Sequence, residues 1–201
     1  MDFEHLISQK KVVFFDGAMG TELARRGLDT GGLLSLTDPE HIFALHLEYA
    51  ELGVDCLTTN TFTANRFYMD THGLKADLEK LNILGIDLAR RAVMQGQLVF
   101  GDIGPTGKLL QPYGDCSEEE FINNYREQAA VLSGAGADGI IIETMTDLRE
   151  ARCALIGCRK ETDLPVLVTL SFSTIDRGGR TVMGNSVADT VKELECEGAT
   201  A

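Results

Sequence analysis

Short apolar runs alternate with longer amphipathic stretches along this chain, and this alternation constrains the fold more than any other feature. Alternating strand and helix patterns are typical of a parallel sheet covered by helices, so we expect an α/β protein. The runs are rich in β-branched or large apolar residues, and a polar or glycine-containing turn follows each one, which predicts strands buried on both faces. The predicted strands are residues 12–15, 56–60, 98–102, 139–143 and 166–171.

The amphipathic stretches predict helices, and two of them begin with recognisable signals. Asp38 followed by Pro39 predicts an N-cap with proline at the first helical position. Ser117 and Glu120 have the spacing of a capping box. The sequence has no linker, low-complexity tract or change of composition, so we expect one domain over residues 1–201. The predicted helices are residues 21–26, 40–52, 64–72, 78–95, 118–135, 147–161 and 186–197.

An open doubly wound sheet and a closed (β/α)8 barrel of the TIM type both fit this alternation. The residues at the strand ends favour the barrel. Acidic and amide side chains recur where the strands finish, and a barrel gathers such residues on its carboxyl rim, whereas an open sheet spreads them along an edge. These residues are Asp16, Asn60, Asp102 and Glu143. We expect a barrel that is truncated after about five β/α units, since a complete one has eight.

Charge and composition exclude several classes of function. The net charge is -13, and no cluster of Lys and Arg is visible that could neutralise a nucleic-acid backbone. No apolar stretch approaches the roughly 20 residues that span a bilayer, and the first residues are too polar for a signal peptide. The five cysteines are odd in number and lie mostly in apolar or helical stretches, which fits reduced thiols. We therefore expect a cytoplasmic protein without nucleic-acid or membrane partners.

Two glycine-rich motifs fail as nucleotide sites because of their context. GAGADG at residues 134–139 has the letters of the dinucleotide fingerprint, but it follows a predicted helix and leads into a strand. GDIGPTGK at residues 101–108 has five residues between its flanking glycines where a phosphate loop has four, and Leu109 replaces the Ser or Thr that holds magnesium. Structural and ligand-binding interpretations of the second loop both stay open.

No pair of metal-ligating residues has a suitable spacing. His41 with His46, and Cys153 with Cys158, are five residues apart, which separates them by about 140° around a helix. Neither pair therefore presents a zinc-binding face.

Four segments, in this order, resemble those of the homocysteine S-methyltransferase family, which includes the first domain of cobalamin-dependent methionine synthases. They are FDGAMGTE at residues 15–22, TTNTF at 58–62, GDIGPTG at 101–107 and IETMTD at 142–147. The resemblance extends from about residue 12 to the last residue. Four motifs in the same order are far more specific than any one of them.

The resemblance implies a (β/α) barrel that binds homocysteine over its carboxyl rim and methylates its sulfur to give methionine. In that family the acids of the first and last of these segments help to hold the amino acid, which carries over to Asp16 and Glu143, with Gly17 offering a backbone contact. Asn60 and Asp102 complete the candidate substrate-binding residues, and no catalytic residue is assigned. The structural alternative for Asp16 is a helix N-cap, and for Glu143 a cap or an ion pair.

The resemblance also implies zinc and cobalamin. The family uses three cysteine thiolates with the substrate sulfur as the fourth zinc ligand, and zinc lowers the pKa of the coordinated thiol. Those cysteines belong to later strands that this sequence does not contain, so we assign no metal ligand, including Cys196. We expect a partial homocysteine-binding barrel that is inactive alone, with the methyl group carried by cobalamin on another domain or protein.

Other interpretations stay open at this point. An incomplete barrel exposes two sheet edges, which favours self-association. A non-catalytic module could keep the pocket of Asp16 and Glu143 without the zinc half. A barrel enzyme of another chemistry could use Asp102 and Glu143 as acid and base.

Overall fold

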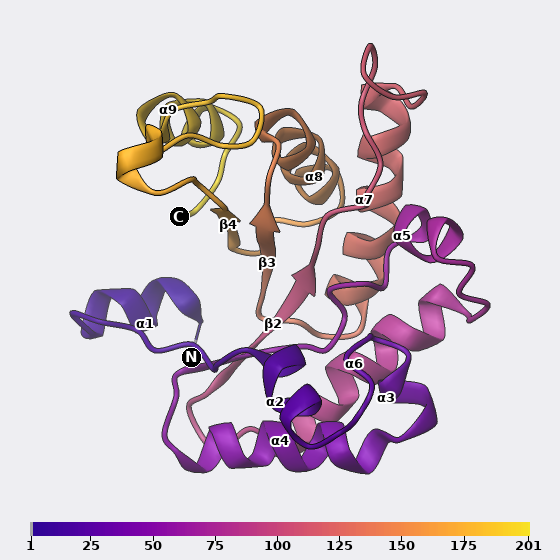
Figure 1. The fold of residues 1–201 in the computed structure, drawn as a ribbon. Coiled ribbons are helices and arrows are strands. Elements are labelled where there is room, and N and C mark those ends of the chain that lie inside the picture. Colours follow the sequence, from indigo (N-terminus) through magenta and orange to yellow (C-terminus); the bar gives the residue numbers. More distant parts are fainter. Residues whose placement is uncertain (1) are drawn as a thin grey trace.

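The computed structural model describes residues 2–201, except for the side chain of Arg177, and is built around a parallel four-stranded sheet (Figure 1). The strand order is β1-β2-β3-β4, so each strand pairs with the next one along the chain. This sequential order is that of a (β/α) barrel and lacks the reversal of a doubly wound sheet. Closure into a barrel stays a prediction. The strands are β1 (Cys56–Thr58), β2 (Leu98–Ile103), β3 (Gly139–Met145) and β4 (Val166–Leu170).

All the predicted helices are present, and the sequence interpretation missed α1, α3 and a short 3-10 helix. The capping box of Ser117 and Glu120 is confirmed. Asp38 precedes Pro39 as predicted, but its carboxylate contacts His41 Nδ1 at 2.7 Å and makes no cap bond. The helices are α1 (Phe3–Gln9), α2 (Met19–Arg25), α3 (Leu34–Thr37), α4 (Pro39–Glu51), α5 (Arg66–Thr71), α6 (Leu78–Ala92), α7 (Glu118–Gly134), α8 (Leu148–Glu161), the 3-10 helix η1 (Ile175–Arg177) and α9 (Val187–Cys196).

The predicted strand at residues 12–15 is wrong, because this segment makes only an isolated parallel bridge between Phe15 and Cys56. Its Phe14 N–H donates to a carboxylate oxygen of Asp55 at 2.9 Å. The side chains of Val12 and Phe14 are 58% and 62% exposed. Apolar residues favour a strand when neighbours cover them on both sides, and here only β1 lies beside them. The other four strands begin at the predicted residues.

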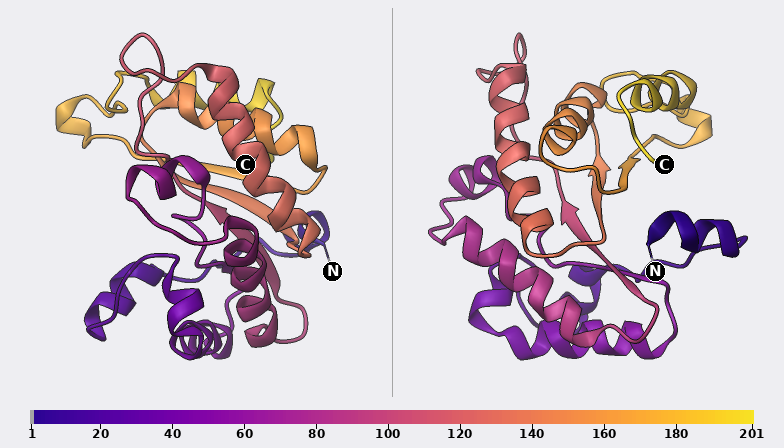
Figure 2. Two further views of the ribbon diagram at one scale, coloured as in Figure 1. Left: turned by 90° about the vertical axis from the view of Figure 1, so that its right-hand side faces the viewer. Right: turned by 180° about the vertical axis from the view of Figure 1, so that it is seen from behind.

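The two faces of the sheet are covered differently. Residues such as Val99 and Ile142 pack into a core with α6, α7 and α8, which lie in a row along this face in Figure 2. The alternate residues belong to a second cluster, in which Phe100 contacts Phe3 of α1 edge to face at 5.1 Å. Helix α1 thus covers the start of the second face, and the carboxyl ends of the strands on this face are left to polar side chains.

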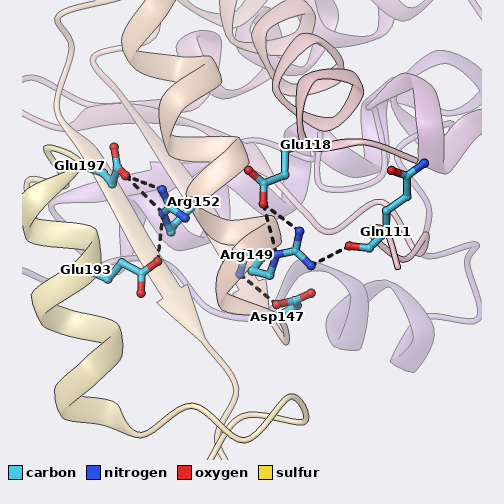
Figure 3. Close-up of polar contacts among 7 residues, drawn as sticks. All are labelled: Gln111, Glu118, Asp147, Arg149, Arg152, Glu193 and Glu197. Atoms are coloured by element: carbon cyan, nitrogen blue, oxygen red, sulfur yellow. Dashed lines mark hydrogen bonds and ion pairs between the residues drawn. The ribbon is translucent and has the colours of Figure 1, made fainter. Parts of the chain in front are cut away.

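Two arginines of α8 connect it to both neighbouring helices (Figure 3). Arg149 donates to Glu118 of α7 and to the carbonyl of Gln111, each at 2.8 Å. Arg152 contacts Glu193 of α9 at 3.0 Å and Glu197, the C-cap of that helix, at 2.8 Å. Helix α9 is therefore held to the rest of the fold partly through one side chain.

The free edge of β4 is bonded by the last residues of the chain. The Thr200 N–H donates to Val166 O at 2.8 Å, and the Val168 N–H donates to Ala201 O at 2.9 Å. The self-association that we expect from exposed sheet edges stays a prediction. Among the helices described, none has the length and apolar character needed to span a bilayer.

Candidate functional site

A cleft of about 390 Å³ lies at the carboxyl ends of β1, β2 and β3, and all five predicted site residues line it. Asp16 and Gly17 come from the segment before α2, and Asn60 comes from the turn after β1. Asp102 lies on β2 and Glu143 on β3. Parallel strands end at a common edge, so side chains from distant parts of the sequence meet there. The volume is in the range of small-molecule sites.

Asp16 is fixed by β1 and does not cap α2. Its carboxylate accepts hydrogen bonds from the Thr58 N–H at 3.0 Å and from the Thr58 hydroxyl at 2.9 Å. The N-cap of α2 is Ala18, which makes no side-chain cap bond. The helix-cap alternative for Asp16 is therefore wrong.

Burial dominates the electrostatics of Asp16. It raises the pKa of the carboxyl from 3.8 to about 7; the hydrogen bonds from Thr58 oppose the rise, and the nearby charge of Glu143 adds to it. Asp16 is therefore poised to gain or lose a proton near neutral pH, and a cation bound beside it would favour the ionised form.

Gly17 permits a close approach by Tyr49 of α4. A Cβ atom at this position would lie 2.8 Å from Tyr49 Oη and 3.2 Å from two ring carbons. A side chain at residue 17 would thus displace the tyrosine that packs against this part of the cleft wall.

Asp102 is the most buried of the three carboxyl groups in the cleft, and Asp16 and Glu143 are half-buried. The side chain of Asp102 is buried, and its Oδ1 has no hydrogen-bond donor among the described residues. Burial raises the pKa of Asp102 well above its usual value, and Glu143 raises it further through its charge and a side-chain hydrogen bond. The ion-pair alternative for Glu143 finds no support, because no basic residue is among those that line the cleft.

Asn60 has a structural contact as well as a place in the cleft wall. Its Nδ2 donates to Ser35 Oγ at 3.1 Å, which fastens α3 to the turn after β1. A ligand would therefore meet an amide that is already held by the protein.

The sequence interpretation missed the threonines around the acids. Thr58 holds Asp16, and Thr144 follows Glu143 with φ 55°, where the pairing of β3 with β4 is irregular. The Thr144 N–H donates to Thr169 Oγ1 at 2.9 Å. Positive φ is costly for a β-branched residue, and such strain is concentrated at functional sites. The repeated threonines of TTNTF were a signal for Thr58, whereas nothing in the sequence indicates the backbone angle of Thr144.

The glycine-rich segment at residues 101–108 is held by hydrogen bonds to Glu150 of α8. Glu150 accepts hydrogen bonds from the Thr106 N–H at 2.8 Å, the Thr106 hydroxyl at 2.7 Å and the Tyr125 hydroxyl at 2.7 Å. Within this segment Asp102 lines the cleft. The N–H and hydroxyl of Thr106 instead donate to the buried Glu150 and do not face the cleft. These contacts favour the structural interpretation of the loop.

The described residues do not fit a zinc ion. Within residues 2–201, no group of three or more His, Cys, Asp or Glu side chains is arranged to hold a metal. Burial raises the pKa of Cys56, Cys153 and Cys158 to about 12 in each case, which disfavours the thiolate that zinc requires. Cys196 is exposed on α9.

Proteins of known function resemble this chain over nearly all of its length. The methionine synthase of Mycobacterium tuberculosis is 28% identical over 214 residues, covering 96% of this chain and 18% of that protein. The methionine synthase of Mycobacterium leprae is 27% identical over 206 residues, covering 92% and 17%. The chain thus spans less than a fifth of the length of these curated relatives.

Solved structures agree with the sequence comparisons. The homocysteine methyltransferase MmuM from Escherichia coli is 26% identical and superposes with a TM-score of 0.78, in both its oxidized and its metallated form. The superposition covers 96% of this chain, with 72% of the oxidized and 74% of the metallated structure. The profile of the family described as Homocysteine S-methyltransferase matches residues 13–201. The chain therefore belongs to the homocysteine S-methyltransferase family.

Proposed function

We propose that the cleft binds the amino-acid end of homocysteine so that its sulfur can accept a methyl group. Three carboxyl groups, those of Asp16, Asp102 and Glu143, converge there, and no Lys, Arg or His is among the residues that line it. Such a site favours a ligand with a cationic group, and charge-assisted hydrogen bonds to an ammonium are among the strongest in proteins. Family membership supplies the substrate class, since homocysteine carries this ammonium.

In this proposal Asp16 and Glu143 contact the ammonium. Asp16 is preorganised, because Thr58 already holds its carboxylate through two hydrogen bonds. The bound cation stabilises the ionised form of Asp16 and so lowers its pKa from about 7. Binding therefore releases a proton near neutral pH and weakens as the pH falls below about 7.

Activation of the sulfur needs a further component. A free thiol with a pKa near 8.5 is mostly protonated at neutral pH, and the described residues offer no zinc site that could deprotonate it. We infer that any zinc is supplied by residues other than those described, and that cobalamin, as the methyl carrier, binds to another domain or protein. The chain alone then binds substrate without turning it over.

A non-catalytic binding module is the second candidate. The lack of a metal-binding group within residues 2–201 favours it, because binding needs only the acidic cleft. Elemental analysis of protein purified with homocysteine tests whether the described residues hold zinc at all. Zinc near one ion per chain would overturn our assignment of the zinc ligands to other residues.

Isothermal titration calorimetry tests the binding proposal. We expect L-homocysteine to bind about 10- to 100-fold more tightly than 4-mercaptobutanoic acid, which lacks the ammonium, because a hydrogen bond to a charged group contributes about 1.5–3 kcal/mol. Asp16→Asn and Glu143→Gln should each reduce this preference. Asp87→Asn is the control, since Asp87 lies on α6 with Arg91 at 3.6 Å and does not line the cleft. Equal affinity for the two ligands would overturn the proposal.

A further inference from the structure

One carboxyl group in the cleft has no basic residue beside it in the lining and has one oxygen without a hydrogen-bond partner. The Asp102 side chain is only 4% exposed at the carboxyl end of β2. Its neighbours in the cleft wall include the carboxyl groups of Asp16 and Glu143. A buried ionised carboxylate normally needs a cation or several hydrogen-bond donors. The residues that line the cleft include no base, and Asp102 Oδ1 is unpartnered among the described residues, so the backbone N–H of Ile103 is the donor that opposes the effect of burial on this carboxyl.

The two threonine hydroxyls that bond to the Asp102 backbone are already committed. The Thr61 hydroxyl donates to the Asp102 carbonyl at 2.7 Å. Thr59 Oγ1 lies 2.6 Å from Thr61 Oγ1 and accepts the Asp102 N–H at 3.0 Å. Because the hydrogen of Thr61 is used, the Thr59 hydroxyl must donate to Thr61. Neither threonine therefore has a hydrogen left for the Asp102 carboxyl.

The contact with Glu143 decides where a proton must lie. Asp102 and Glu143 both line the cleft, and the pKa of Asp102 is raised by the charge of Glu143 and by a side-chain hydrogen bond with it. Two ionised carboxylates cannot form this bond, because both only accept, so one of the two must carry a proton. Asp102 is the more buried partner, whereas Glu143 is half-buried and keeps access to water. The proton is therefore less costly on Asp102.

We propose that Asp102 is an uncharged carboxylic acid that donates its O–H to Glu143 and so orients the Glu143 carboxylate toward a cationic ligand. Asp102 is then a positioning residue, and Glu143 keeps its charge for the ligand. The ligand part rests on the proposed function, whereas the protonation state does not. A neutral Asp102 also leaves two ionisable carboxyls, those of Asp16 and Glu143, to face one ammonium.

Infrared spectroscopy of the unliganded chain tests the protonation state. Near pH 8.5, about 1.5 units above the pKa of about 7 for Asp16, the Asp16 carboxyl is ionised. We expect the carbonyl stretch of one protonated carboxylic acid per chain. It should persist in Asp16→Asn and disappear in Asp102→Asn. Absence of this stretch from the unmodified chain, or its persistence in Asp102→Asn, would overturn the proposal.

Isotope labelling keeps this test decisive if Asp102→Asn fails to fold. Carboxyl-¹³C aspartate incorporated into the unmodified chain should shift the band, because the acid is an aspartic acid. A band that shifts only with labelled glutamate would place the proton on Glu143 and overturn the proposal.

Rescue by a conservative variant tests the positioning role. Asp102→Asn can still donate an N–H to Glu143, whereas Asp102→Leu cannot. We expect the affinity for L-homocysteine to fall about fivefold in Asp102→Leu and clearly less in Asp102→Asn, since a net hydrogen bond contributes about 1 kcal/mol. Equal losses in both variants would overturn the positioning role. An acid band without homocysteine binding would instead refute the proposed function and leave the protonation state standing.

Discussion

Gly85 of α6 lies directly against Thr61, so closely that a Cβ atom at residue 85 would overlap Thr61 Cγ2. This approach places the Thr61 hydroxyl 2.7 Å from the Asp102 carbonyl and the Thr61 carbonyl 3.0 Å from Gln128 Nε2 of α7. Glycine in a helix costs about 1 kcal/mol relative to alanine. The close contact between α6 and Thr61, which places the Thr61 hydroxyl against Asp102, explains why residue 85 is glycine.

Gly85→Ala should destabilise the protein despite the better helix propensity of alanine. Over-packing typically costs about 1–3 kcal/mol, which exceeds the gain of about 1 kcal/mol in propensity. Thr61→Ser should rescue the variant, because serine removes Cγ2 and keeps the hydroxyl. Urea unfolding of the two single variants and the double variant measures the coupling. Purely additive changes in unfolding free energy would contradict the assigned contact.

Gly17→Ala should weaken homocysteine binding by displacing Tyr49, whose Oη lies 2.8 Å from the position of the new Cβ. Gly20→Ala is the matched control, because its nearest neighbour, Thr30 Cβ, is 3.8 Å away and both glycines line the cleft. We expect a loss of about tenfold in affinity for Gly17→Ala, the equivalent of about 1.4 kcal/mol, by calorimetric titration. Similar losses in both variants would contradict the role of the tyrosine contact.

Local pattern was sufficient to predict most of the secondary structure. The apolar runs predicted four of the strands, because strand and helix periodicities are properties of short segments. Helix α1 was missed since it has only seven residues, of which Phe3 and Leu6 are buried. The segment at residues 12–15 has a strand pattern, but strand formation needs neighbours, and Asp55 takes the N–H of Phe14.

The meeting of the acids could be predicted, whereas their chemistry could not. Asp16, Asp102 and Glu143 follow three strand patterns, and parallel strands end at one edge, so a shared cleft follows from the sequence. The hydrogen bonds from Thr58 to Asp16 and the unpartnered oxygen of Asp102 depend on side-chain packing across the fold. The periodicity of apolar residues and the spacing of motifs in the sequence do not predict such contacts.

Arg152→Met should loosen α9 selectively, because Arg152 contacts both Glu193 of that helix and its C-cap residue, Glu197. Methionine keeps most of the apolar stem, so the change removes mainly the charge. We expect faster hydrogen exchange in α9, corresponding to about 1 kcal/mol, and a smaller difference at high salt. In the matched variant Arg149→Met, exchange should change near Glu118 and not in α9. Unchanged exchange in α9 of Arg152→Met would show that apolar packing alone holds this helix.

Asp16→Asn should stabilise the fold in a pH-dependent way. Because the pKa of Asp16 rises from 3.8 to about 7 on folding, the folded chain holds a proton between these values that the unfolded chain has released. Stability therefore falls as the pH rises from about 4 to about 7, and the full penalty remains above about 7. An asparagine can accept the same hydrogen bonds from Thr58 without a charge. Urea unfolding should show Asp16→Asn to be about 2–4 kcal/mol more stable than the unmodified chain at pH 8, with little difference at pH 4. A stability difference that does not vary with pH, or that is larger at pH 4, would contradict the proposed penalty for burying an ionised Asp16. In our interpretation this penalty is the cost in folding stability of holding a carboxylate in the cleft for its ligand.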